Sequence, residues 1–514
     1  SLLYAVVCSL CCVVKIVCFA PESGEMPSAL ALSNSHLSSK VSVLTVRDPF
    51  EDLELERISI GSNFRAYTGV NMYRTCLLGD FNGDGLDDLM LISVFPLSAE
   101  LDVDGAYVLF GQDGAAPLTY TSLYSWEPSE TAGFRIVGSG QLEEYSCGGG
   151  GDHNNDGFPD ILLTRPFYSS DSGITYVIYG GNMLNYTDFN LTTFVSGPLG
   201  FRIHGGPGDR SGQSVANAGD INSDDYDDII LCSPGYTESG EDPSCVCYVL
   251  FGQDALLRTE DIFLRNFTFS QSTGFKVWGS INGNAFATSV SGNFDFNNDS
   301  YSDVLIGNSF GTPLGGERTA AYVIFGHESS YSFDTIDIAT FESNSLVGVR
   351  ILSDVASEYP WDEVHGVGDV NNDGIEDVMV EVTSYLTAVL FGTTDASDID
   401  LNGFVTGSKG FLVTNAFESF PSGDVNDDGI PDLLFSVPTE TNWNVVVILF
   451  GKVSSAPFVD VDLLVFSSGL DGVRIVGKGS VVTIASPGGP AGDFNGDGVA
   501  DVVMVAYTDE SFEV

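Results

Sequence analysis

The residues best suited to chemistry in this sequence are the carboxylates and amides of one nine-residue stretch. Asp80–Asp88 reads Asp-Phe-Asn-Gly-Asp-Gly-Leu-Asp-Asp. Six counterparts begin at Asp152, Asp220, Asp295, Asp369, Asp424 and Asp493. Every copy has Asp at positions one, five and nine and Asn at position three. This spacing indicates a cation site, because Ca²⁺ binds about six to eight oxygens from carboxylates, amides and backbone carbonyls.

The remaining positions of these acidic loops fit the same chemistry. Position six is Gly in five copies and Asp225 or Ser300 in the other two, and there we expect a sharp turn with positive φ. Position seven would offer its backbone carbonyl to the cation, and the carboxylate of position nine would complete the set of ligands. The predicted metal ligands are Asp80, Asn82, Asp84, Leu86, Asp88, Asp152, Asn154, Asp156, Phe158, Asp160, Asp220, Asn222, Asp224, Tyr226, Asp228, Asp295, Asn297, Asp299, Tyr301, Asp303, Asp369, Asn371, Asp373, Ile375, Asp377, Asp424, Asn426, Asp428, Ile430, Asp432, Asp493, Asn495, Asp497, Val499 and Asp501.

The residues after each loop decide between two kinds of calcium site. An EF-hand loop closes with Glu at position twelve and lies between helices. Here short apolar runs follow, such as Leu89–Ile92 and Val502–Val505, and these are typical of buried strands. A single acidic cluster would be an ordinary polar turn. Seven copies favour calcium loops in β-hairpins, with up to seven Ca²⁺ ions bound.

Composition limits the fold and the partners. The chain of 514 residues has 59 Gly and 35 Phe, and 43% of it is hydrophobic, which suits an all-β protein with a large core. A net charge of −52 argues against nucleic acid as a partner, because phosphate binding needs clustered Lys and Arg. Without metal the loops repel one another, so we expect metal binding and folding to be coupled.

The first residues suggest export. Residues 1–20 are apolar apart from Lys15 and are typical of a secretory signal, with cleavage after Ala20 or as late as Ala31. The chain begins with Ser, so we expect its N-terminus to be truncated. A membrane anchor is the alternative, and residues 21–40 would be a linker. We expect a secreted or cell-surface glycoprotein, with sequons at Asn185, Asn190 and Asn266.

Five cysteines lie outside the signal-like segment, and they allow disulfides without fixing their pairing. A cross-hairpin disulfide between Cys232 and Cys245 or Cys247 is one interpretation, and buried thiols are the other. The five residues are Cys76, Cys147, Cys232, Cys245 and Cys247.

A repeat unit surrounds each acidic loop. A small-residue segment precedes the loop and an apolar strand follows it, and after a variable connection come a third and a fourth strand. The expected third strands, which end in Phe-Gly or Tyr-Gly, are 107–111, 176–180, 248–252, 322–326, 389–392 and 448–451. The expected fourth strands are 133–136, 200–203, 274–277, 349–351, 411–413 and 473–475. This pattern predicts a seven-bladed β-propeller with four antiparallel strands in each blade, covering residues 41–514.

The order Gly-Asp-x-Asn-x-Asp-Gly-x-x-Asp, apolar strand and Tyr-Val-x-Phe-Gly resembles the FG-GAP repeats of integrin α-subunit β-propellers. The resemblance covers residues 41–514. It implies calcium in the loop between strands one and two on the lower face, and ligands on the upper face. Integrin propellers carry the metal loop in only some blades, whereas all seven repeats have it here. This difference puts pairing with an integrin β-subunit in doubt.

The chain ends after two strands of the last repeat, so we expect residues 41–46 and 63–67 to complete it and to close the ring. A basic residue recurs in the fourth strands, and we interpret this position as scaffold that pairs with acidic neighbours. The recurring residues are Arg65, Arg135, Arg202, Lys276, Arg350 and Arg474.

The favoured function is a non-catalytic adhesion or interaction module with structural calcium. Its partner would be an extracellular protein or glycan on the face opposite the loops, and the membrane would be reached only through an N-terminal anchor. The alternatives are the binding or catalytic part of an extracellular enzyme acting on polysaccharide or lipid, and a structural coat or filament protein. We assign no catalytic residue, because none of the five His lies in a recognisable motif. The oligomeric state is left open.

Overall fold

A computed structural model describes most of the chain. The described residues are 14–19, 39–40, 43–46, 53–55, 66–70, 72–93, 105–113, 120–123, 126–138, 146–181, 187–236, 245–279, 286–308, 319–354, 363–438, 445–477 and 483–507. Their regular secondary structure is almost entirely β-strand, and the short helical turns α1 (Tyr168–Asp171) and η2 (Ile338–Thr340) lie in connections.

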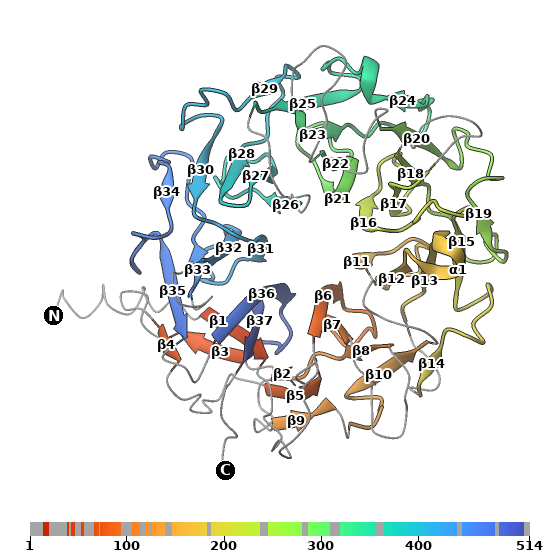
Figure 1. Ribbon diagram of the computed structural model, residues 1–514, viewed down its shortest axis with the longest axis horizontal. Coiled ribbons are helices and arrows are strands. Elements are labelled where there is room, and N and C mark those ends of the chain that lie inside the picture. Colours follow the sequence, from red (N-terminus) through yellow and green to blue (C-terminus); the bar gives the residue numbers. More distant parts are fainter. Residues whose placement is uncertain are drawn as a thin grey trace, which may run out of the picture.

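Six sheets of five strands, which we call blades one to six, are arranged around a central opening (Figure 1). From the centre outward, blade one consists of β6 (Met72–Gly79), β7 (Asp88–Ser93), β8 (Gly105–Leu109), β10 (Gly133–Val137) and β14 (Phe189–Asn190). Blade two consists of β11 (Ser146–Gly151), β12 (Asp160–Arg165), β13 (Ile174–Ile178), β15 (Gly200–His204) and β19 (Ile262–Phe263). Blade three consists of β16 (Ser214–Gly219), β17 (Asp228–Ser233), β18 (Val246–Leu250), β20 (Gly274–Trp278) and β24 (Ile336–Asp337). Blade four consists of β21 (Phe286–Phe294), β22 (Asp303–Asn308), β23 (Thr319–Ile324), β25 (Gly348–Leu352) and β29 (Ile399–Asp400). Blade five consists of β26 (Val364–Gly368), β27 (Asp377–Thr383), β28 (Leu386–Leu390), β30 (Gly410–Thr414) and β34 (Val461–Asp462). Blade six consists of β31 (Ser419–Gly423), β32 (Asp432–Val437), β33 (Val445–Leu449), β35 (Gly472–Gly477) and β4 (Leu53–Leu55).

The remaining strands form a different sheet, which we call the closing sheet. It has seven strands, in the order β3-β1-β37-β2-β5-β9 with β36 paired to β37. Its strands are β1 (Val14–Phe19), β2 (Ser39–Lys40), β3 (Val43–Val46), β5 (Ala66–Val70), β9 (Tyr120–Ser122), β36 (Thr483–Gly492) and β37 (Asp501–Tyr507). The prediction of seven four-stranded blades is therefore wrong: the fold is an all-β propeller with six five-stranded blades and a closing sheet of another order.

Two features account for the error. The fifth strand of each blade comes from the connection that precedes the fourth strand of the following repeat, and it pairs in parallel with the fourth strand of its own blade, as Ile136 does with Phe189. Such strands are only two or three residues long and carry no periodic pattern. In the closing sheet β1 pairs in parallel with β37, and β3 pairs with β1 instead of taking the expected third place.

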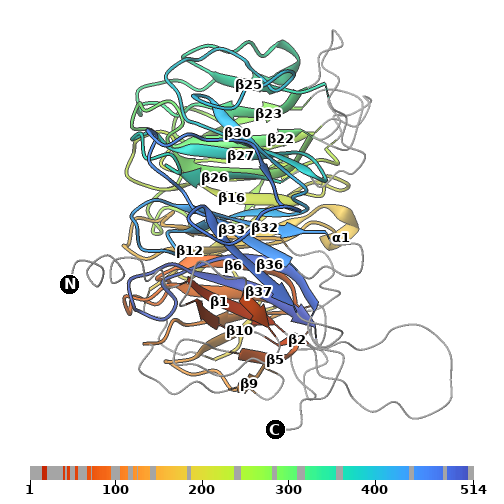
Figure 2. The ribbon, with the colours of Figure 1, turned by 90° about the vertical axis from the view of Figure 1, so that its left-hand side faces the viewer.

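The core lies between neighbouring blades. The central strands are buried on both faces, as the run from Asp160 to Thr164 in β12 shows. One apolar cluster joins Phe110 and Phe134 of blade one to Ile161 and Tyr176 of blade two. In side view, strands such as β22 and β27 run along the short axis of the ring (Figure 2). Each sheet therefore needs apolar side chains on both faces, which explains the continuous apolar runs of the sequence.

In three blades, the basic residue of the fourth strand ties that strand to the start of the fifth strand. Arg135 bonds Asp188 through two nitrogens, and Arg202 and Arg350 bond Asp261 and Asp398 in the same way. Each Asp immediately precedes a fifth strand. For these three arginines the structural interpretation is confirmed, whereas Arg65 lies outside the described residues.

Replacing Arg350 with Ala is expected to lower the free energy of unfolding by about 1–2 kcal/mol, since it removes a bidentate ion pair that is less than one-third exposed. Burial favours a higher pKa for Asp398, but hydrogen bonds from Arg350 and Ser343 hold that pKa below its ordinary value. The stabilisation is therefore present above the ordinary carboxyl pKa of about 4 and is lost as the pH falls through the folded-state pKa. Denaturant unfolding of both proteins at neutral and acidic pH measures the difference.

The matched control is Arg210→Ala. The Arg210 side chain is 42% exposed and lies 3.8 Å from Asp171, so its removal should change stability by less than about 0.5 kcal/mol. Equal losses in the two variants would contradict the role given to Arg350.

Candidate metal-binding loops

Each acidic loop connects the innermost strand of its sheet to the second strand. In blade one the loop runs from Asp80, directly after β6, to Asp88, the first residue of β7. Position six has positive φ in every copy, as predicted, between 72° and 92°. Asp225 and Ser300 adopt this conformation although they are not Gly, at a cost of about 1–2 kcal/mol each. Their loops therefore keep the same turn despite the substitution.

The oxygens of positions one, three and five turn toward the interior of the loop. In blade one, Asp80 Oδ1 and Asn82 Oδ1 both accept from the Asp84 N–H, at 2.9 and 2.8 Å. Asp80 Oδ2 accepts from Gly85 N–H, and Asp84 Oδ1 accepts from Leu86 N–H. The bonds of positions one and five recur in all seven loops. Three side chains thus bring oxygens together over one short stretch of backbone.

Position nine links the loop to the end of the third strand. Asp88 is fully buried; its Oδ1 accepts from Gly111 N–H at 2.9 Å and its Oδ2 from Asn82 N–H at 3.1 Å. The carboxylates at position nine of blades two to six likewise bond the glycine after the third strand. A Cβ on Gly111 would lie 2.7 Å from the Asp87 carbonyl oxygen. The Gly of the Phe-Gly motif is therefore required where the strand meets the loop.

Burial raises the pKa of the position-nine carboxyls when no metal is bound. The pKa is about 8 for Asp88, Asp377 and Asp432, and the nearby acids of positions one and five add to the burial effect. For Asp160, Asp228 and Asp303 the pKa is also well above its ordinary value, again mainly through burial. A neighbouring cation would reverse this effect by favouring the charged form.

The loops fit a hard cation in their donor chemistry. Asn222 Oδ1 and Asn371 Oδ1 at position three are buried and have no hydrogen-bond partner within the described ranges. Among the same residues no three His, Cys, Asp or Glu side chains form a closed ligand group. The carboxylates bond the backbone N–H groups of their own loops instead, although each oxygen keeps a further lone pair. The two unsatisfied amide oxygens and the clustered carboxylates match Ca²⁺, and the ligand assignment stays a prediction.

The seven loops are also joined to one another in a continuous belt. The residue after the Phe-Gly glycine donates its N–H to the position-two carbonyl of the preceding loop, as Gln112 does to Phe494 at 2.9 Å. Five further links of this kind join the loops of blades one to six, and Ala500 N–H to Asp424 O closes the circle at 3.2 Å. A change in the backbone conformation of one loop would therefore alter its hydrogen bonds to the loops of both neighbouring sheets.

The acids at position eight were missed by the sequence reasoning. Asp87 Oδ2 accepts from Asp493 N–H at 2.7 Å, and thus caps the first residue of the preceding loop. Asp227 and Glu376 cap the corresponding N–H groups in the same way. Position eight is acidic in blades one, three and five and is Pro, Ser or Ala in the other copies. The acidic residues at position eight of every second blade are the sequence pattern that could have indicated these capping contacts.

The structure also settles the disulfide pairing. Cys76 of β6 is bonded to Cys147 of β11, which joins the innermost strands of blades one and two. Cys232 is bonded to Cys247 across the β17–β18 hairpin, while Cys245 is a buried thiol that belongs to neither disulfide. The cross-hairpin interpretation is confirmed with Cys247 as the partner.

Comparison with known proteins gives partial matches to integrin α-subunits, and no family model matches the chain. Integrin alpha pat-2 of Caenorhabditis briggsae is 26% identical over 235 residues, which cover 45% of this chain and 17% of that protein. Integrin alpha-6 of Gallus gallus is 30% identical over 156 residues, covering 30% and 12%, and integrin alpha-3 of Mus musculus is 31% identical over 134 residues, covering 26% and 11%. The matches thus span at most 17% of the length of these three relatives. Together with the propeller fold, they confirm the resemblance of this chain to the FG-GAP propellers of integrin α-subunits.

Proposed function

We propose that this protein is an adhesion-type propeller at the cell surface or outside the cell, which binds partners without catalysis. The partial matches to integrin α-subunits support this proposal. Two disulfides within the described residues fit an oxidising compartment. Within the same residues, no helix is long and apolar enough to cross a membrane. Glycosylation and an N-terminal signal or anchor belong to the same proposal.

The observation that carries the proposal is the belt of acidic loops. Each loop is bonded to the next through backbone groups, and each encloses oxygens suited to Ca²⁺. Bound calcium would neutralise the carboxylates of positions one, five and nine. The loops therefore act as scaffold that fixes the sheets relative to one another, and ligands would bind at the opposite ends of the innermost strands.

A glycan and protein array probed with the calcium-loaded protein tests the proposed function. We expect selective binding to an extracellular protein or glycan that is abolished by chelation, because the binding face depends on the belt. Turnover of a polysaccharide or lipid substrate would instead support the enzyme alternative. Self-assembly into filaments with no array partner would support the coat alternative.

A further inference from the structure

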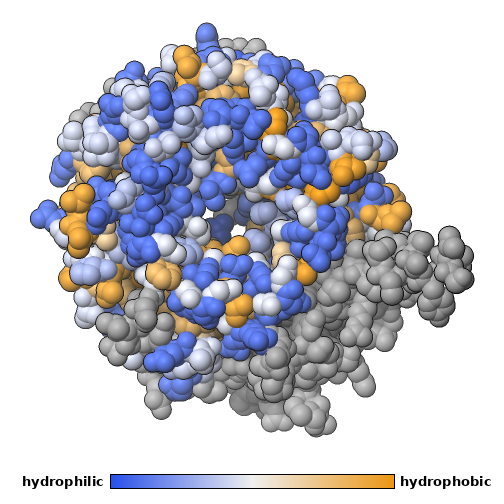
Figure 3. All heavy atoms as spheres, turned by 180° about the vertical axis from the view of Figure 1, so that it is seen from behind, coloured by the Kyte–Doolittle hydropathy of each residue, from blue (hydrophilic) through white to orange (hydrophobic). Residues whose placement is uncertain are grey.

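A cavity of about 560 Å³ occupies the central opening and is separate from the acidic loops. The innermost strands of the blades and of the closing sheet contribute to its wall. A surface view along the ring axis shows a central opening that is edged largely by hydrophilic residues (Figure 3). The wall is rich in Gly and Ser, and the charged or titratable side chains that the described residues contribute to it are Arg74, Glu363 and His365.

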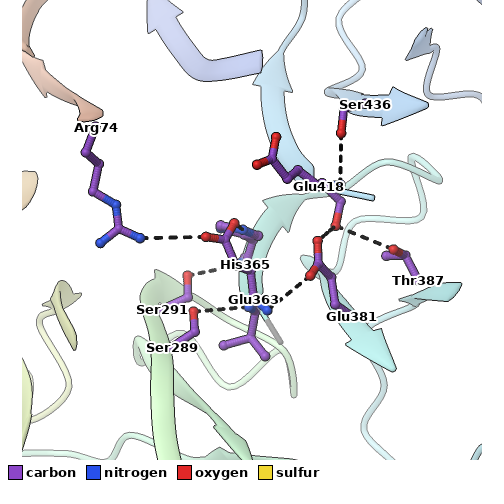
Figure 4. A network of polar contacts seen from close by, with 12 residues as sticks. Arg74, Ser289, Ser291, Glu363, His365, Glu381, Thr387, Glu418 and Ser436 are labelled. Atoms are coloured by element: carbon purple, nitrogen blue, oxygen red, sulfur yellow. Dashed lines mark hydrogen bonds and ion pairs between the residues drawn. The ribbon is translucent and has the colours of Figure 1, made fainter. Parts of the chain in front are cut away.

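These three residues form one cluster across the opening. Arg74 lies near the start of β6 in blade one, whereas Glu363 and His365 lie at the start of β26 in blade five. Arg74 Nη2 is 3.6 Å from Glu363 Oε1, and His365 Nε2 is 3.4 Å from Glu363 Oε2 (Figure 4). The acidic loops follow the other ends of β6 and β26. The cluster is therefore at the end of the channel opposite the belt.

The cluster has hydrogen-bonding capacity that the protein does not use. Arg74 donates to Ser146 Oγ at 2.7 Å, and its side chain is 43% exposed. A guanidinium has five N–H donors, and 3.6 Å is too long for a direct hydrogen bond to Glu363. Within the described part of the chain, Glu363 Oε2 has no hydrogen-bond partner. Arg74 and Glu363 thus line the same cavity, where the guanidinium has unused N–H donors and one buried carboxylate oxygen of Glu363 has no hydrogen-bond partner within the described residues.

Neighbouring hydroxyls add donors on the same wall. Ser289 Oγ accepts from Val364 N–H, and Ser291 Oγ accepts from Gly366 N–H, so each hydroxyl keeps its own proton for donation. These residues lie on β21, beside β26 (Figure 4). Glu381 lies behind this wall; it is 7% exposed, and Ser419 donates to it. Glu381 is thus part of the supporting layer of the site.

We propose that this end of the channel binds a small zwitterion, whose carboxylate pairs with Arg74 and whose ammonium group pairs with Glu363. A simple anion would be repelled by Glu363, and a simple cation by Arg74, because the two charges are only 3.6 Å apart. A ligand with both charges close together, such as an amino acid or a short peptide, satisfies both residues and fits within the cavity. This site lies at the end of the innermost strands that the proposed function assigns to ligands, but it involves no residue of the calcium loops, so its binding is tested separately from adhesion.

The charge state of Glu363 supports the assignment. Burial favours a higher pKa for this carboxyl, but the adjacent His365 and Arg74 hold its pKa below the ordinary value. Glu363 is therefore ionised at neutral pH and can accept from an ammonium group. Among the described residues, the further acids near the cluster are Glu381 on β27, behind the wall, and Glu418, which immediately precedes β31 (Figure 4).

Isothermal titration calorimetry of the calcium-loaded full chain with glycylglycine at pH 7 tests the proposal. We expect one saturable site, with binding at least about tenfold tighter than that of acetate or methylammonium, since each carries only one of the two charges. N-acetylglycinamide, which has neither charge, should not compete. No saturable binding of glycylglycine, or acetate binding equally tightly, would overturn the proposal.

Two variants locate the site. Arg74→Gln and Glu363→Gln should each weaken glycylglycine binding at least about tenfold, while Arg210→Gln should leave it unchanged. Arg210 is a matched control, because its side chain is 42% exposed and is also in a long ion pair, at 3.8 Å. Thermal melts check that every variant is folded. Unchanged binding in folded Arg74→Gln and Glu363→Gln would refute the site.

Discussion

Removing calcium with excess chelator is expected to lower the melting temperature by about 15–20 °C. A site held at 100 times its dissociation constant adds about 2.7 kcal/mol to stability, and unfolding a chain of this size carries an entropy of about 1 kcal/mol per kelvin. Seven loops joined in one belt would lose this contribution together. The net charge of −52 adds self-repulsion once the cations are gone.

The effect of chelation should grow with pH. In the metal-free protein the pKa of Asp88, Asp377 and Asp432 is raised to about 8 by burial. The folded state then holds more protons than the unfolded state, so metal-free stability falls as pH rises from about 4 through 8. Calcium binds the charged carboxylates, so the calcium-loaded protein does not lose stability in this way as the pH rises. Calorimetric melts with calcium and with chelator at pH 5 and pH 8 measure the difference, which should be larger at pH 8.

Restoring calcium provides the control for that experiment. Adding calcium back at constant ionic strength should return the melting temperature to its original value, and magnesium should do so less well, because it demands a stricter octahedral geometry. An unchanged melt in excess chelator would remove the basis for structural calcium in these loops.

The sequence was sufficient to predict the local geometry of the loops. Strict repetition placed Asp at position nine, and the apolar run after Asp88 indicated a hairpin strand. The positive φ at position six followed from Gly85 and its counterparts, and it also holds at Asp225 and Ser300. These features depend on neighbours within a few residues, so the order of residue types is enough to indicate them.

The sequence could not indicate contacts that depend on the closed ring. The strand Phe189–Asn190 has two residues and pairs with a strand about fifty residues earlier, at Ile136. The recurring basic position of Arg135 indicated an acidic neighbour, but only the folded ring identifies that neighbour as Asp188. Likewise, Cys76 meets Cys147 because two innermost strands lie side by side around the channel. The number of strands in each blade was therefore predicted incorrectly. The loops and the third strands of blades one to six were recognised, although these strands end two residues earlier than expected.

Position nine has two roles, and a pair of variants can separate them. Asp88 is buried and bonds the N–H groups of Gly111 and Asn82, whereas Asp84 is exposed and bonds the loop residue Leu86. If both are metal ligands, Asp88→Ala and Asp84→Ala should each remove one ion of the seven expected from the loops. Bound-metal stoichiometry after dialysis measures this loss.

The two variants should differ in stability once calcium is absent. In chelator, Asp88→Ala leaves the buried N–H of Gly111 and the partly buried N–H of Asn82 unsatisfied and should cost about 3 kcal/mol. Asp84→Ala should cost less than about 1 kcal/mol, because water can replace its bond. Denaturant unfolding in chelator makes the comparison. If Asp88→Ala keeps all its calcium but is destabilised, position nine is a structural latch and not a ligand. If both variants are equally stable in chelator, the hydrogen bond from Gly111 N–H to Asp88 does not contribute measurably to holding the third strand against the loop.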